Sequence, residues 1–265
     1  MAKAKMSVTL LAHSRLSDSY CSMLSQDNEE IYDKYSEDSI TDGQAVALSA
    51  IRTCYSPNKP SEIVALEGAK YFGKQATDGG QGTEADRLFR MIVRSGHTST
   101  LEHLSFTFAI EGVSRALLAQ LTRHRVGFSY SVQSQRYVRF GSGDKSGGFD
   151  YVVPENMSGK YGEMPDGDGR YNAETLFHQA MEITQQVYDD LRKAGVPAED
   201  ARAVLPQASA CNLVMTANLR ALLEFYSKRQ SGKGAQKEIT ELADALKGAV
   251  IKVEPWTAQF FATKG

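Results

Sequence analysis

The sequence lacks several features that define other classes of protein. It has three cysteines among 265 residues, Cys21, Cys54 and Cys211. This odd number at wide spacing gives neither a disulfide framework nor a CxxC metal motif. No run approaches 18 consecutive apolar residues, which excludes a transmembrane helix, and the apolar run at 8–12 is too short for a secretory signal. We therefore expect a reduced, cytoplasmic protein without a membrane partner.

The total charge also excludes classes of protein. The chain has 30 Lys and Arg against 32 Asp and Glu, a formal net charge of -2, and 42% apolar residues. These values exclude a disordered chain and a wholly basic nucleic-acid coat. The length is enough for a sizeable buried core in one large domain or two small ones.

Local patterns predict a mixture of helices and strands. Thr83 followed by acids is typical of a helix N-cap, and Gly96 of its end. Apolar and polar residues alternate at 104–110, which indicates a strand, and helical spacing returns at 113–124. Further strands are expected at 6–12, 134–137, 151–153 and 211–217, and further helices at 43–55, 172–194, 218–229 and 236–251.

These elements show no regular βαβ alternation. The pattern therefore favours the α+β class, with a mainly antiparallel central sheet packed with helices. We expect a single domain over 1–265, with a glycine-rich surface excursion at about 141–171.

Acids and lysines are absent from one long stretch. Residues 112–143 contain no Asp, Glu or Lys, yet hold five of the 15 arginines: Arg115, Arg123, Arg125, Arg136 and Arg139. Arginine suits bidentate contact with phosphate and carboxylate. A solvated basic face would normally contain lysine and some acids, so we interpret this stretch as an anion site.

A second basic segment lies further along the chain. Between residues 201 and 236 the only acid is Glu224, and the cations are Arg202, Arg220, Lys228, Arg229 and Lys233. Two such segments predict a ligand with more than one anionic group. A nucleotide or dinucleotide fits, and so does RNA, with nearby aromatic residues as stacking partners.

Three of the five histidines, His97, His103 and His124, fall within 28 residues. No cysteine lies near them to complete a zinc site, and we expect no metal. His124 lies between Arg123 and Arg125, and their like charge is expected to lower its pKa, leaving it neutral at pH 7.

The basic motifs together resemble the signature of flavin-dependent thymidylate synthases. That signature begins with Arg-His-Arg, continues with seven or eight further residues, and ends with Ser, commonly followed by Arg-Tyr. In this chain Arg-His-Arg is 123–125, eight residues follow, and the segment that begins with Ser is 134–137. The segment 96–103 is similar to the family's GHxS/TxxEH motif. Gln120, the segments 201–206 and 218–220, Arg229 and 235–236 follow in the family's order, so that the resemblance spans about 90–256.

The resemblance implies roles by position. FAD is expected to contact His97, Ser99, Arg123, His124, Arg125, Asn218, Leu219, Arg220 and Glu224. The substrate dUMP is expected to contact Gln120, Arg123, Gln133, Ser134, Gln135, Arg136, Arg202 and Arg229. Arg229 is the expected catalytic residue, because its charge would favour the N3-ionised uracil. Ser134 is expected to contact phosphate or a hydroxyl rather than act as a nucleophile, since no base is adjacent in sequence.

The resemblance also implies the reaction and the assembly. Members make dTMP from dUMP, with 5,10-methylenetetrahydrofolate as the carbon donor and NADPH-reduced FAD as the hydride source, in homotetramers with shared active sites. The resemblance implies no nucleic-acid partner. Two alternatives stay open on the sequence: an arginine-rich RNA- or nucleotide-binding module without catalysis, and a catalytically inactive nucleotide-binding relative.

Overall fold

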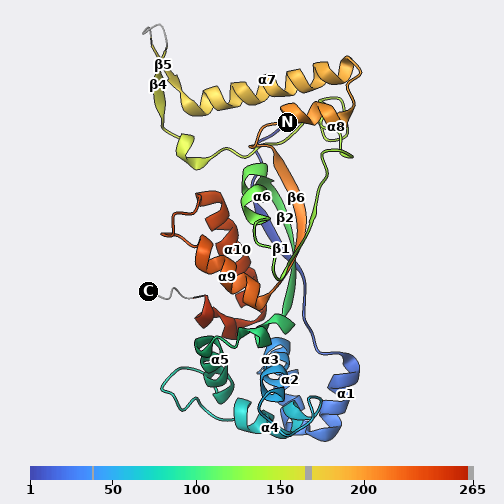
Figure 1. Cartoon of the computed structure of the whole chain (residues 1–265), viewed down its shortest axis with the longest axis vertical. Coiled ribbons are helices and arrows are strands. Elements are labelled where there is room, and N and C mark those ends of the chain that lie inside the picture. Colours follow the sequence, from blue (N-terminus) through green and yellow to red (C-terminus); the bar gives the residue numbers. More distant parts are fainter. Residues whose placement is uncertain (38, 165–168, 262–265) are drawn as a thin grey trace.

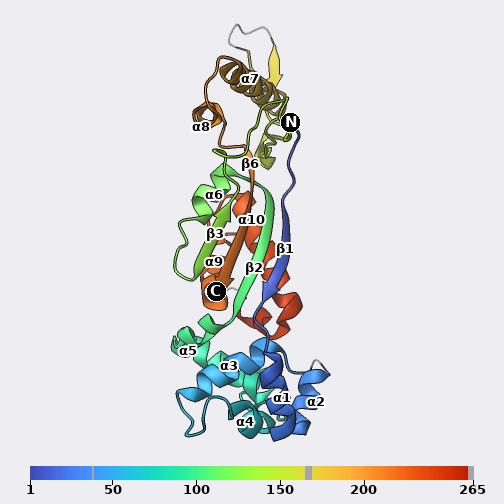
Figure 2. The ribbon, with the colours of Figure 1, turned by 90° about the vertical axis from the view of Figure 1, so that its right-hand side faces the viewer.

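The centre of the protein is a four-stranded antiparallel sheet (Figures 1 and 2). The computed structural model describes residues 1–37, 39–164 and 169–261. The strands are β1 (Ser7–His13), β2 (Ser105–Ser114), β3 (Phe128–Val132) and β6 (Ala210–Asn218), in the order β1-β2-β6-β3. The predicted α+β class with a mainly antiparallel sheet is confirmed.

One face of the sheet is buried under helices. Phe106, Phe108 and Ile110 of β2 lie beside Leu213 and Met215 of β6, and all five side chains are buried. Helices α9 (Leu219–Arg229) and α10 (Lys237–Val253) cover this face, as Figure 1 shows. Burial of each large apolar side chain stabilises the fold by about 1.5–3 kcal/mol. Helix α6 (Arg115–Leu121) is shorter than the predicted 113–124, because residues 113 and 114 still belong to β2.

A group of helices lies at one end of the sheet (Figure 1). These are α1 (Asp18–Asp27), α2 (Glu29–Ser36), α3 (Asp42–Thr53), α4 (Ile63–Phe72) and α5 (Glu84–Ser95). The predicted cap of α5 is confirmed: Thr83 and Asp86 form a capping box, and Gly96 ends the helix with a φ of 80°. The 3-10 helix η1 (Thr98–His103) then leads into β2.

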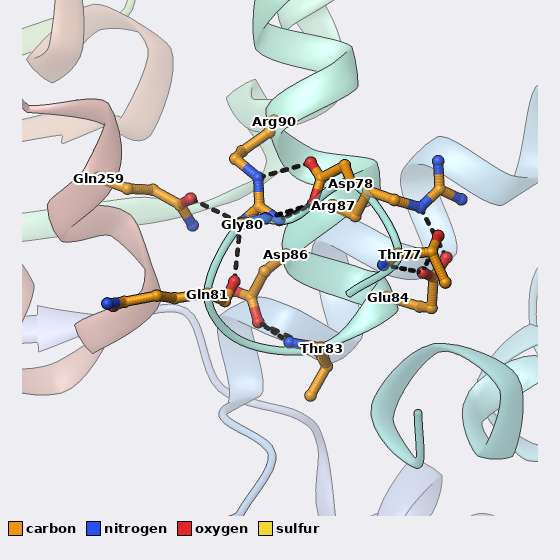
Figure 3. A network of polar contacts seen from close by, with 10 residues as sticks. All are labelled: Thr77, Asp78, Gly80, Gln81, Thr83, Glu84, Asp86, Arg87, Arg90 and Gln259. Atoms are coloured by element: carbon orange, nitrogen blue, oxygen red, sulfur yellow. Dashed lines mark hydrogen bonds and ion pairs between the residues drawn. The ribbon is translucent and has the colours of Figure 1, made fainter. Parts of the chain in front are cut away.

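Arg90 fixes the glycine-rich loop between α4 and α5 (Figure 3). Its guanidinium donates to both carboxylate oxygens of Asp78, to the carbonyl of Gln81 and to the side chain of Gln259. The hydrogen bonds from Arg90 to the Asp78 carboxylate are the main cause that lowers the pKa of Asp78 to about 2. The loop is thereby tied both to α5 and to the C-terminal 3-10 helix η4 (Pro255–Phe260).

A second hydrophobic cluster lies at the opposite end of the sheet. The long helix α7 (Ala173–Lys193) packs Met181 and Tyr188 against Phe140, Phe149 and Tyr151. The remaining elements there are η2 (Glu155–Met157), β4 (Tyr161–Glu163), β5 (Arg170–Asn172), α8 (Ala198–Ala201) and η3 (Arg202–Val204).

The glycine-rich stretch differs from the predicted surface excursion. Phe149 and Tyr151 are buried, because the aromatic residues between the glycines complete the second cluster. The expected strand 151–153 is reduced to Tyr151, which bridges Lys3 and Ser209. Residues 165–168 of the stretch lie outside the described residues. A single domain over 1–265 stays a prediction.

Glu254 joins the C-terminal end of α10 to the start of α3. Its side chain is 1% exposed and accepts hydrogen bonds from the hydroxyl of Thr41, from Gly43 N at 2.9 Å and from Trp256 Nε1 at 2.6 Å. Burial raises the pKa of this carboxyl although the three donors oppose the shift. The carboxyl therefore connects three segments that are far apart in sequence.

We expect Glu254→Ala to lower the free energy of unfolding by about 3 kcal/mol, because buried donors lose their acceptor. Urea unfolding followed by circular dichroism measures this change. Glu241→Ala, at an exposed glutamate of α10, is the matched control and should shift stability by less than about 0.5 kcal/mol. Equal shifts for the two variants would show that the Glu254 contacts contribute nothing.

Candidate active site

Arg229 and His124 form the first part of the site. His124 lies between α6 and β3, and Arg229 is the last residue of α9. Arg229 Nε donates to His124 Nε2 over 3.3 Å. The imidazole packs edge-on against the Phe225 ring at 4.9 Å between centroids. The structure thus brings together two predicted site residues from distant parts of the chain.

The pKa of His124 lies below its usual value of 6.5, as predicted, but the predicted cause was wrong. Burial is the largest cause, and the charges of Arg229 and Lys228 come next. Arg123 and Arg125 are adjacent in sequence, but both are exposed. Neutral His124 can accept the Arg229 bond at Nε2 only with its proton on Nδ1.

We expect histidine ring signals in an NMR titration to give His124 a pKa below 6.5. Lys228→Ala should raise it and Arg229→Ala should raise it more, because each removes a nearby positive charge. Since the folded pKa is depressed, the linked stability is present above pH 6.5 and is lost as the pH falls through the folded pKa. His124→Gln assigns the signal, and a titration at or above 6.5 would contradict the geometry.

The segment around Ser134 is a turn, and the predicted strand over 134–137 was wrong. Strand β3 ends at Val132. Val138 N donates to the Ser134 carbonyl at 2.9 Å, and Arg136 N donates to Ser134 Oγ at 3.2 Å. A serine side chain competes with strand pairing by bonding to backbone two residues ahead. Ser134 and Arg136 therefore do not share a strand face, and Gln135 lies within the same turn.

Two residues that the sequence analysis did not assign hold this turn in place. Arg115 donates from a guanidinium NH2 to the Gln133 carbonyl at 3.1 Å. Asn212 accepts from Gly112 N at 3.0 Å, and its Nδ2 donates to Gln133 Oε1 at 3.3 Å. Arg115 could have been singled out as a member of the acid-free stretch, whereas no local signal marked Asn212.

Arg136 and Arg202, predicted to hold phosphate, both contact Glu199, one at its side chain and the other at its backbone. Arg136 Nε donates to Glu199 Oε2 at 2.7 Å, and Arg202 Nε donates to the Glu199 carbonyl at 2.9 Å. The acid-free stretch is therefore partly neutralised by an acid from another part of the chain. A phosphate bound by Arg136 would compete with the Glu199 carboxylate.

The predicted flavin contacts on η1 and α9 lie on neighbouring segments. Arg220 forms an ion pair with Glu102 of η1 at 2.5 Å. His97 precedes η1, and its Nδ1 lies 3.0 Å from the Tyr55 hydroxyl. Ser99 is exposed on the same 3-10 helix.

Asn218 and Leu219 have structural roles at the start of α9. The Asn218 side chain caps the helix by accepting from Ala221 N at 2.8 Å. Leu219 is fully buried, and its backbone N–H donates a hydrogen bond to the Leu104 carbonyl. Leu219 therefore belongs to the core.

Two further predicted residues make polar contacts of their own. Glu224 is exposed and pairs with Lys228 at 2.5 Å, and the hydrogen bond with Lys228 is the largest cause of its lowered pKa. Gln120 donates to Gln236 Oε1 at 2.6 Å. Gln120 thus connects α6 to the start of α10.

The structure does not gather all of these groups into one pocket. His124 precedes β3 and Ser134 follows it, and the five-residue strand between them is about 17 Å long at roughly 3.4 Å per residue. The predicted site residues therefore fall into two groups, one at each end of β3, which we call half-sites. In the described part of the chain, no three His, Cys, Asp or Glu side chains gather as a metal site.

The protein belongs to the α+β class, because helices cover one face of its antiparallel sheet. Arginines lie near both ends of the edge strand β3, and we regard them as candidate anion sites. Residues 37–256 match the family model described as thymidylate synthase complementing protein. The chain belongs to this family.

Two curated relatives illustrate the similarity. The flavin-dependent thymidylate synthase of Clostridium tetani is 35% identical over 228 residues, covering 80% of this chain and 79% of the relative. That of Nitratidesulfovibrio vulgaris is 42% identical over 182 residues, covering 66% of each chain. The comparisons give no support to an RNA-binding module.

A solved structure shows the same fold. The UMP/dUMP methylase PolB from Streptomyces cacaoi, bound with 5-Br dUMP, superposes with a TM-score of 0.66. The two chains are 23% identical, and the match covers 98% of this chain and 96% of that one. In the described residues, no helix is long and apolar enough to cross a membrane.

Proposed function

We propose that this protein methylates dUMP to dTMP as a flavin-dependent thymidylate synthase. The observation that carries the proposal is the hydrogen bond between Arg229 and a His124 whose pKa is lowered. This pair places a fixed positive charge at the end of α9, where it can stabilise an anionic pyrimidine ring. The family and its named relatives support the same reaction.

The finer assignments are part of the proposal. The carbon donor is 5,10-methylenetetrahydrofolate, and FAD, when bound and reduced by NADPH, supplies the hydride. The exposed Arg123 and Arg125, with the Arg220–Glu102 pair, offer charged donors for the flavin pyrophosphate. Arg136 and Arg202 hold the dUMP phosphate, and the Ser134 turn presents its hydroxyl beside them.

The residues of this chain have distinct tasks in the proposed reaction. Arg229 favours the N3-ionised uracil by stabilising its negative charge. Neutral His124 holds the Arg229 guanidinium by accepting its Nε–H. The contacts to the dUMP phosphate orient the nucleotide, so that its uracil ring is positioned for reaction with the flavin.

We propose a homotetramer in which copies of the chain complete each active site. The separation of about 17 Å between the two ends of β3 supports this, because two half-sites of different copies can form one pocket. Leu176, Ile183 and Val187 along α7 are exposed, as is Val214 on the sheet, and they offer apolar surface for subunit contacts. A cytoplasmic location is proposed from the three free cysteines.

The function is tested with the purified protein in two steps. The visible spectrum should show bound flavin after addition of FAD, and NADPH oxidation should then require dUMP. Protein that binds no flavin, or that oxidises NADPH at the same rate without dUMP, would contradict the proposed function.

A further inference from the structure

Tyr130, in the middle of β3, contacts the turn that carries the Arg-His-Arg segment. Its hydroxyl lies 2.7 Å from the His124 carbonyl and 3.1 Å from the Leu121 carbonyl, so that it joins the end of α6 to the turn. Its ring stacks on Phe128, with 5.9 Å between the centroids and 6° between the planes. Neither the family signature nor the proposed reaction accounts for this hydroxyl contact.

The turn over 121–126 has few other anchors. In the described part of the chain, no side chain besides Tyr130 bonds to the backbone of these residues. The next residue, Gly127, has a φ of 75°, and its carbonyl accepts from Asn218 N at 3.1 Å. Burial raises the pKa of the Tyr130 phenol, which therefore stays a donor at neutral pH. The turn is thus held by Asn218 at its C-terminal end and by Tyr130 before it.

The Tyr130 contact sets the orientation of the peptide that joins His124 to Arg125. This peptide is trans, so that its N–H points away from the carbonyl that Tyr130 holds. Among the described residues, the Arg125 N–H has no hydrogen-bond acceptor, and Val126 beside it is 89% exposed. The open side of the turn therefore presents a main-chain donor together with the exposed side chains of Arg123 and Arg125. Such donors bind phosphate oxygens.

We propose that Tyr130 is a positioning residue, whose hydroxyl fixes the 121–126 turn in the orientation that binds the flavin pyrophosphate. This inference rests on the proposed function. With the turn held in this way, the Arg125 N–H faces the pyrophosphate and the His124 imidazole faces Arg229. Tyr130 acts through the backbone and not by touching the ligand, because its hydroxyl is engaged by the two carbonyls.

The test removes only the hydroxyl, because Tyr130→Phe keeps the ring that stacks on Phe128. The Kd for FAD, measured by quenching of flavin fluorescence, should rise about 10-fold, since FAD must then order the turn on binding. In an NMR titration of FAD-free protein the His124 pKa should rise toward 6.5, because a less fixed turn buries the imidazole less. At saturating FAD the KM for dUMP should change less than about twofold, since Ser134 and Arg136 lie beyond the other end of β3.

Tyr151→Phe is the matched control. It also removes a hydroxyl bond from a buried tyrosine, 2.6 Å to His178 Nδ1, but Tyr151 lies beside Ser209, at the opposite end of β6 from the turn. It should lower the free energy of unfolding in urea by a similar amount, and leave the Kd for FAD and the His124 pKa unchanged.

Two results would overturn the positioning role while dTMP formation by wild type continues. One is an equal rise of the Kd for FAD in Tyr130→Phe and Tyr151→Phe. The other is a Tyr130→Phe protein with the wild-type Kd for FAD and the wild-type His124 pKa. Absence of dTMP in wild type would instead overturn the proposed function, and the His124 titration would still test the role of Tyr130.

Discussion

Arg229→Ala is expected to lower kcat at least about 100-fold while the flavin spectrum of the loaded protein is retained. Removing one fixed group that stabilises developing negative charge costs about 10²–10³ in rate. The contact with His124 holds the guanidinium in one place. Steady-state turnover with saturating dUMP measures the loss.

Lys228→Ala is the matched control for Arg229. Lys228 is adjacent in sequence and carries the same charge, but it is exposed and paired with Glu224. Its removal should change turnover less than about twofold, in keeping with the small energies of surface ion pairs. Unchanged turnover in Arg229→Ala would refute the role that we give this residue.

The second large effect is expected at the candidate phosphate site. Arg202→Ala and Arg136→Ala should each raise the KM for dUMP about 10- to 100-fold, because charge-assisted hydrogen bonds to phosphate are lost. Glu199→Gln should lower this KM, because the carboxylate that competes for Arg136 is neutralised. The measurement is initial rate against dUMP concentration, with FAD content checked for each variant.

Arg139→Ala serves as the control for these variants. Arg139 is exposed in the same acid-free stretch, but it has no predicted ligand role. It should leave the KM for dUMP unchanged. An equal rise in the KM for dUMP in Arg139→Ala would mean that nonspecific positive charge, rather than a specific phosphate site, binds the nucleotide.

Local chemistry was enough to predict much of the fold. The alternation of buried and exposed residues in β2 and β6, and the cap at Thr83, depend on neighbours in sequence. The strand expected at 134–137 failed because alternation alone does not show that the Ser134 hydroxyl bonds its own turn. The buried Phe149 shows that glycine-rich sequence can still supply core residues.

The site could be predicted in its residues but not in its contacts. The signature pointed to Arg136 and Arg220, yet their acidic partners Glu199 and Glu102 lie 63 and 118 residues away. Such pairs are set by the packing of distant elements, which periodicity does not encode. For the same reason, the cause of the lowered His124 pKa could not be read from its sequence neighbours.

Formation of dTMP tests the central claim most directly. The purified protein is loaded with FAD and mixed with dUMP, NADPH and 5,10-methylenetetrahydrofolate, and the nucleotides are separated and identified by mass. The structure predicts a product heavier than dUMP by one methyl group in place of hydrogen, formed only when all components are present. Flavin-loaded protein that binds dUMP and oxidises NADPH but leaves dUMP unmethylated would contradict it.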